Sequence, residues 1–164
     1  MGFVTPITNR DKEFAAMQVL NTIFGAGMTS KLFMNVREKM SLCYSIGSGY
    51  YGSKGILTVS AGIDAGKEKV TRQEILRQLG ACQNGDITAE ELGAAKEAVL
   101  SGLRGIHDSP GAIESYYSTG ALSGLNLTPE EYGKAVEAVT LEDAVEAAKT
   151  VTLHTGLFLK GVGA

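Results

Sequence analysis

The spacing of apolar side chains alternates along the chain between the period of two that is typical of strands and the longer period that is typical of helices. Residues 55–63 alternate with a period of two, which places on one face Leu57, Val59, Ala61 and Ile63. Residues 12–24 follow helical spacing instead, and we expect the glycines at 25 and 27 to end that helix. The pattern therefore predicts a helix and then a strand in the N-terminal half.

Three shorter elements complete this half. Residues 2–7 are predicted to form a short strand, which ends near Pro6 because proline has no amide hydrogen to give to a neighbouring strand. A second helix is expected over residues 31–39, capped by Thr29 or Ser30. Residues 42–51 are predicted to form a strand, and the turn that follows joins it to the strand at 55–63 as a hairpin.

The C-terminal half is mostly helical, and its helix starts carry capping signals. A helix is expected over residues 67–83, ended by Asn84-Gly85. Thr88, Thr128 and Thr140 each stand three residues before an acidic residue, the spacing of a capping box. Ser109-Pro110 begins a further helix, since proline is suited to the first helical turn. A last strand is predicted over residues 152–160.

This order of elements lacks the strict alternation of strand and helix that builds a doubly wound parallel sheet. We therefore predict an α+β fold, with an antiparallel or mixed sheet and helices packed on one of its faces. The length of 164 residues fits one domain over residues 1–164. Because the chain opens directly on a strand, we expect it to be a fragment of a longer chain.

Gly47, Gly49 and Gly52 have the G-x-G-x-x-G spacing of a dinucleotide-binding turn. Such a turn needs a helix directly after it, but here a strand follows, and Asp64 only imitates the ribose-binding acid. The pattern therefore argues against a nucleotide enzyme. Two explanations remain for glycines within a strand: a bulge or close approach of another backbone, and tight packing of a helix onto their face.

Composition excludes several classes of partner. The formal net charge is −3 and the pI about 5.4, so no basic surface invites nucleic acid. No apolar run is long enough to cross a bilayer, and no signal segment is recognisable, so we expect no membrane partner and a cytoplasmic location. Cys43 and Cys82 are predicted to be free thiols, since they belong to no C-x-x-C pair.

One segment points to a family. Residues 25–45 read GAGMTSKLFMNVREKMSLCYS: a glycine-rich turn, a serine, a Leu-Phe helix, Arg-Glu-Lys and then a Leu-x-Tyr strand. This order resembles the C-terminal-type domain of the pitrilysin/insulinase family of inverted-motif zinc metallopeptidases, which includes the mitochondrial processing peptidases. The resemblance continues through Lys54-Gly55, the Thr88 box, His107-Asp108-Ser109 and residues 139–143, so it covers nearly the whole chain.

The resemblance implies roles for two residues. In that family an arginine and a tyrosine of this domain reach into a closed chamber and hydrogen-bond the substrate backbone near the scissile carbonyl. The matching positions are Arg37 and Tyr44, which are therefore the candidate catalytic and substrate-binding residues. A guanidinium and a phenol both donate hydrogen bonds, as a developing oxyanion requires. Taken without their surroundings, they would be a solvated helix residue and a half-buried strand residue.

No metal site is expected in this chain. The family binds zinc through an inverted His-x-x-Glu-His motif, whereas His107 and His154 stand far apart and belong to no such motif. We read His107 as a cap that complements a helix dipole and His154 as a structural residue. If the full protein is active, the resemblance implies that zinc is supplied by another domain or subunit.

Two functions follow from the resemblance. In the first, the chain would be a substrate-binding domain that orients a peptide for a zinc-bearing N-terminal half or a paired family subunit. Alternatively, it belongs to a catalytically inactive member of the family that acts as a binding or scaffolding partner. In either case this domain is not expected to be active alone.

Overall fold

The computed structural model describes residues 1–161 and contains one four-stranded sheet, ordered β2-β3-β1-β4. Its strands are β1 (Gly2–Val4), β2 (Cys43–Tyr51), β3 (Ile56–Ile63) and β4 (Thr152–Thr155). Every neighbouring pair is antiparallel. The predicted α+β class is therefore confirmed. Of the two forms of sheet left open, antiparallel or mixed, the sheet is antiparallel.

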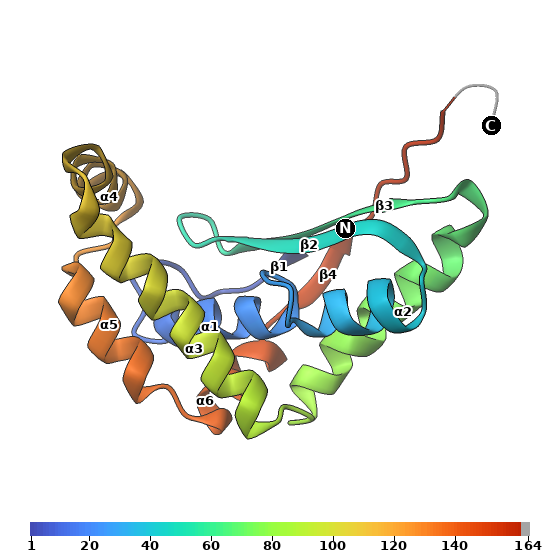
Figure 1. The fold of residues 1–164 in the computed structure, drawn as a ribbon, viewed down its shortest axis with the longest axis horizontal. Helices are drawn as coiled ribbons and strands as arrows, with labels where there is room; N and C mark the ends of the chain where they lie inside the picture. The colour runs from blue at the N-terminus through green and yellow to red at the C-terminus, as the bar shows by residue number, and fades with distance from the viewer. Residues whose placement is uncertain (162–164) are drawn as a thin grey trace.

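Helices cover the lower face of the sheet in Figure 1 and leave its upper face uncovered. Helices α1 (Phe14–Phe24) and η1 (Leu32–Lys39) pack directly against the sheet, and α2 (Glu68–Gln83) and α6 (Leu141–Lys149) pack against α1. To one side extend α3 (Ala89–Arg104), α4 (Pro110–Ser123) and α5 (Pro129–Ala138). Two short 3-10 turns serve as connections: η2 (Ala65–Lys67) joins β3 to α2, and η3 (Gly105–Asp108) joins α3 to α4. Packing of helices on one face is thus confirmed.

Helix α1 is the centre of the core. Nine of its eleven residues are buried, including Met17, Val19 and Leu20. It packs beneath the inner face of the sheet, where Phe3, Leu57 and Val59 are also buried. Burial of each such side chain contributes about 1.5–3 kcal/mol, so this shared layer is what holds sheet and helices together.

Two strands are shorter than the sequence predicts. The strand predicted over 2–7 ends at Val4, because the chain then turns at Pro6 and the Ile7 carbonyl accepts a hydrogen bond from the Tyr50 hydroxyl at 2.7 Å. The strand predicted over 152–160 ends at Thr155. It pairs only with β1, and its last partner there is Gly2, so no further β1 residue is available to extend it.

Helix packing does not explain the glycines of β2. Ser48 and Tyr50 point toward the helical layer, where they bond to Asn21 and Ile7, so Gly47 and Gly49 face the uncovered side. A bulge does occur in β2, but it lies between Cys43 and Ser45 rather than at the glycines. Another backbone does come close to β2, since the Ser48 amide donates to the Gly25 carbonyl at 3.0 Å, but a Cβ at Gly47 would lie 3.6 Å from that oxygen, which is an ordinary contact distance that does not require glycine.

The turn of the hairpin requires glycine for two different reasons. A Cβ at Gly52 would lie 1.8 Å from the Asn9 side-chain oxygen. Gly55 has a φ of +60°, and a Cβ there would lie 2.3 Å from the Thr5 carbonyl oxygen. A strand follows this turn directly, so the third glycine of the G-x-G-x-x-G pattern does not open a helix.

Candidate functional site

Arg37 and Tyr44 lie on either side of a tight reversal of the chain. Arg37 belongs to η1, which is π-helical, and Tyr44 is the second residue of β2, within the bulge. Between them Ser41 adopts a left-handed conformation with φ of 48°. The Ser41 amide donates to the Arg37 carbonyl and the Leu42 amide to the Val36 carbonyl, both at 3.0 Å. These bonds fix the end of the helix relative to the strand.

The two residues share one cavity of about 380 Å³. Its lining is completed by neighbours of both residues and by the end of β3, namely Glu38, Ser41, Leu42, Cys43, Asp64 and Lys67. The Arg37 side chain is 41% exposed and Tyr44 is 72% exposed, so solvent reaches both. The structure therefore brings together the two residues that the sequence singled out.

The Arg37 guanidinium is positioned by stacking rather than by a strong ion pair. Its central carbon lies 4.7 Å from the centre of the Phe33 ring, within the range of a cation–π interaction. The nearest carboxylate is that of Glu38, with 3.8 Å between the Arg37 Nη1 and the Glu38 Oε1. No hydrogen bond joins the guanidinium to another side chain among residues 1–161, so its donors can meet a ligand.

Tyr44 is held differently. Its hydroxyl donates to the Asp64 Oδ1 at 2.7 Å, and the Asp64 Oδ2 lies 3.3 Å from the Lys67 ammonium nitrogen. Lys67 also donates to the Ser41 carbonyl at 3.0 Å. The hydrogen bond to Asp64, followed by the charge of that carboxylate, raises the pKa of Tyr44. The same bond is the main cause that lowers the pKa of Asp64, with Lys67 adding to it.

This pairing qualifies the expected role of Tyr44. A phenol has a single proton to donate, and here that proton is given to Asp64. In this conformation Tyr44 can offer a ligand only an acceptor, so donation to a carbonyl requires that the bond to Asp64 be exchanged. The sequence reasoning missed Asp64 and Lys67 as members of the site. Counting outward from the hairpin turn would have placed Asp64 close to the start of β2.

The described residues contain no group of three or more His, Cys, Asp or Glu placed to hold a metal ion. His107 lies in η3, where its Nε2 is 3.0 Å from the Glu130 Oε1, and His154 lies in β4. Cys43 and Cys82 are both free thiols, as predicted. Burial raises the pKa of Cys82 to about 12 and also raises that of Cys43, so neither thiol is activated.

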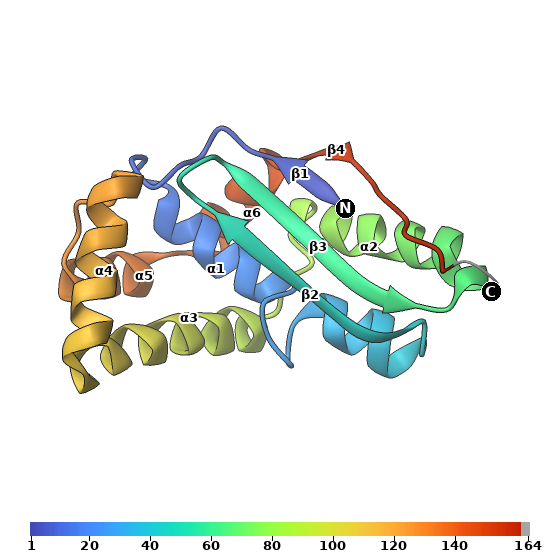
Figure 2. The ribbon, with the colours of Figure 1, turned by 90° about the horizontal axis from the view of Figure 1, so that it is seen from above.

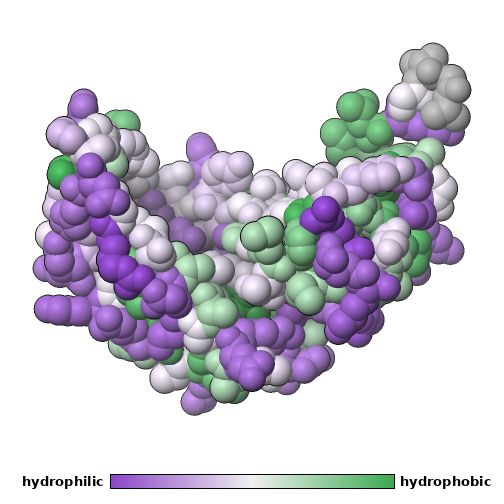
Figure 3. Space-filling view, viewed as in Figure 1, coloured by the Kyte–Doolittle hydropathy of each residue, from purple (hydrophilic) through white to green (hydrophobic). Residues whose placement is uncertain are grey.

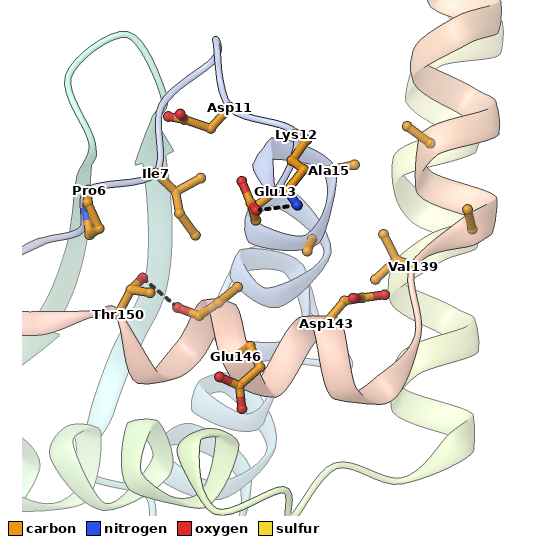
Figure 4. Close-up of a pocket in the computed structure, with 14 residues that line it drawn as sticks. Pro6, Ile7, Asp11, Lys12, Glu13, Ala15, Val139, Asp143, Glu146 and Thr150 are labelled. Carbon is orange, nitrogen blue, oxygen red and sulfur yellow. Dashed lines mark hydrogen bonds and ion pairs between the residues drawn. The ribbon is translucent and has the colours of Figure 1, made fainter.

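A larger cavity, of about 750 Å³, lies elsewhere, between the start of α1 and helices α5 and α6 (Figure 4). Its floor is formed largely by alanines and its rim by charged residues with local partners. Glu13 lies 3.6 Å from Lys12, and Asp143 accepts hydrogen bonds from Thr140 at the start of α6. It is lined by no histidine or cysteine, and neither predicted site residue lines it.

No helix within residues 1–161 combines the length and the apolar character that a membrane span requires.

The structure thus combines an antiparallel sheet, covered by helices on one face, with a cavity shared by Arg37 of η1 and Tyr44 near the start of β2. The sequence model described as "Peptidase M16 inactive domain" matches residues 1–99. The chain belongs to this family.

Relatives and solved structures are similar over most of the chain. A Bacillus subtilis protein named as a probable inactive metalloprotease, YmfF, is 32% identical over 161 residues, covering 98% of this chain and 38% of that protein. An uncharacterized zinc protease from the same organism, YmxG, is 30% identical over 127 residues, covering 76% of this chain and 31% of that protein. The chain thus spans about a third of the length of these relatives.

The fold also matches experimental structures. A conserved protein from Enterococcus faecalis V583 superposes with a TM-score of 0.84 at 33% identity, covering 92% of this chain and 36% of that one. A protease from Helicobacter pylori superposes with a TM-score of 0.82 at 18% identity, covering 92% of this chain and 37% of that one. The second likeness concerns the fold alone.

Proposed function

We propose that this chain is the substrate-binding domain of a zinc metallopeptidase of the M16 family. In this role Arg37 and Tyr44 contact the backbone of a bound peptide near its scissile carbonyl, while zinc is supplied by another domain or subunit. The observation that carries the proposal is that both residues line one solvent-accessible cavity.

Arg37 is suited to act on a carbonyl that becomes an oxyanion. Its charge is permanent, and its stacking on Phe33 holds the guanidinium plane without using the N–H groups. Preorganised donors of this kind stabilise a transition state because they need no rearrangement when the negative charge develops. We assign Arg37 the main electrostatic role. Tyr44 takes part only after its hydroxyl exchanges the hydrogen bond to Asp64 for one to the peptide.

The zinc partner is inferred from family membership and from the length of the relatives. YmxG is described as an uncharacterized zinc protease. Because this chain matches 31% of YmxG, that protein has further sequence in which a metal site can reside. Zinc would polarise the scissile carbonyl and activate water there. Within residues 1–161 we assign no metal ligand.

The test is to combine this chain with the zinc-bearing half of its parent protein and to measure cleavage of an unstructured peptide. We expect Arg37→Ala to lower kcat about 100-fold with little change in KM, because a transition-state donor is lost. Arg104→Ala is the matched control, since Arg104 is an exposed arginine on α3, paired with Glu97 and outside this cavity. An unchanged kcat in Arg37→Ala would refute the assigned role.

A second function is favoured by one comparison. YmfF is described as a probable inactive metalloprotease, which supports a catalytically silent scaffold or binding partner. A silent scaffold would form a stable complex with a zinc-bearing subunit, and Arg37→Ala would leave the activity of that subunit unchanged. The two functions are thus separated by the same variant.

A further inference from the structure

Strand β1 is unusually short for a central strand. It spans three residues, whereas β3 beside it spans eight. Its ladder with β3 covers Ile56 to Thr58, and the Met1 main chain adds one more pair by exchanging hydrogen bonds with Val59 at 2.7 and 2.8 Å. Beyond Met1 no strand among the described residues continues this ladder along Ser60 to Ile63.

The main chain of β3 is ready to accept such a continuation. In an antiparallel ladder, main-chain groups of alternate residues point to the same side. The Val59 amide points to β1, since it donates to the Met1 carbonyl, and therefore the Ala61 amide and carbonyl point the same way. An unpaired strand edge of this kind is a template for pairing with another extended segment.

The chain that follows β4 forms the opposite wall. Figure 2 shows residues 156–161 running beside β3 past the N-terminus, with α2 beneath the space between them. Leu157 and Leu159 on this arm are 87% and 89% exposed, and the arm carries hydrophobic surface in Figure 3. An extended segment with exposed leucines and no ladder partner can pair with another strand.

A cavity of about 80 Å³ lies in this space. It is bounded by the end of β3, by α2 and by residues 156–158. Thr71 of α2 lines it and is 2% exposed, yet its hydroxyl has no hydrogen-bond partner. A buried hydroxyl without a partner costs about 1–3 kcal/mol, so the unpaired oxygen indicates that a group is missing from this space.

We propose that this slot receives an extended polypeptide strand that leads directly into Met1 and continues β1 between β3 and residues 156–160. The register of β1 places the residue two positions before Met1 opposite Ala61 and above Thr71, while the residue directly before Met1 faces Ser60. The inserted strand is therefore apolar at the first of these positions and polar at the second. The matched region is 38% of YmfF, so proteins of this family contain further sequence able to supply the strand.

The experiment extends the present chain at its N-terminus by four residues, after an initiator methionine. One variant carries Val-Lys-Val-Lys, which directs both valines toward α2. The control carries Lys-Val-Lys-Val, which has the same composition and charge but the opposite phase, because a shift of one residue moves every side chain to the other face. Melting temperature and amide exchange at Ala61 and residues 157–160 are measured for both variants and for the unextended chain.

We expect Val-Lys-Val-Lys to raise the melting temperature by about 2–4 °C or more. Exchange of the Ala61 amide should slow at least tenfold in this variant alone. Equal melting temperatures for the two extensions, or an Ala61 amide that exchanges at the rate of the unextended chain, would overturn the proposal. The proposed strand insertion does not depend on the roles assigned to Arg37 and Tyr44, so either proposal can be refuted while the other stands.

Discussion

Tyr44 and Asp64 control each other's ionisation. The hydrogen bond between them favours the protonated phenol and the charged carboxylate, so the pKa of Tyr44 lies above its ordinary value and that of Asp64 below. Both groups are at the surface, where solvent screens charges, and the effect is therefore carried mainly by the short bond itself. The state of one proton thus decides what Tyr44 can do for a ligand.

We predict that Asp64→Asn lowers the pKa of Tyr44 back toward its ordinary value of 10. The charge that opposes formation of tyrosinate is removed, so the phenol ionises at lower pH than in the unaltered chain. The measurement is a titration by the ultraviolet absorbance of tyrosinate, with Tyr44→Phe used to identify the contribution of this residue. An unchanged titration of Tyr44 in Asp64→Asn would show that the two groups do not interact in solution.

Among the elements, the β2–β3 hairpin depends most clearly on single residues. Gly55 combines a left-handed conformation with a backbone oxygen where a side chain would begin, so neither constraint can be relieved by moving a side chain. The same position lies beside the Thr5 amide, which donates to the Gly55 carbonyl at 2.9 Å. The hairpin turn and the chain after β1 are thus fixed together.

We predict that Gly55→Ala destabilises the protein by about 1–3 kcal/mol or more. The matched control is Gly93→Ala, in the interior of α3, where a Cβ would meet no atom within 4 Å. There alanine should stabilise the protein by about 0.5–1 kcal/mol, because glycine lowers helix stability. Chemical denaturation compares the two free energies of unfolding, and a Gly55→Ala variant as stable as the parent would contradict the steric argument.

The sequence predicted best those elements whose limits are set by neighbouring residues. The capping boxes at Thr88, Thr128 and Thr140 all form, and α3, α5 and α6 begin directly after them. Ser109 caps α4 with Pro110 in its first turn, as predicted. These signals succeed because the side chain and the amide that it accepts from are only three residues apart.

Features that depend on distant partners were not predicted. The limits of β1 and β4 are set by which residues each finds opposite, and this cannot be read from either strand alone. The π-helical form of η1 was missed as well, since eight residues are too few to separate its period from that of an α-helix. In the site, the arginine and the tyrosine were found by their family context. Their partners Asp64 and Lys67 are brought in by the hairpin.

On the scale of the whole molecule, burial is distributed unevenly. Helix α1 is buried along most of its length, whereas Gly120 is the one buried residue of α4. Tyr117 and Leu122 of α4 are 50% and 90% exposed, and Figure 1 shows this helix at the far end of the molecule. Elements with few buried contacts open at lower free energy than the core does.

We predict that the amides of α4 exchange with solvent through local opening, while those of α1 exchange only on global unfolding. Protection in α4 should be at least about tenfold lower than in α1. Hydrogen exchange followed by mass spectrometry of peptides from each helix tests this directly. Equal protection of the two helices would mean that α4 unfolds together with the core.

The Gly25 carbonyl lies at the free edge of β2, where it accepts a hydrogen bond from the Ser48 amide at 3.0 Å. Strand β2 is an edge strand of the sheet and has no charged residue from Cys43 to Tyr51. An uncharged edge strand with unpaired main-chain groups can pair with a strand of another molecule. With that amide occupied in the middle and the bulge displacing Tyr44 at the start, a foreign strand finds only broken stretches to pair with. The glycine loop thus interrupts the free edge of β2, although the strand itself carries no charged side chain.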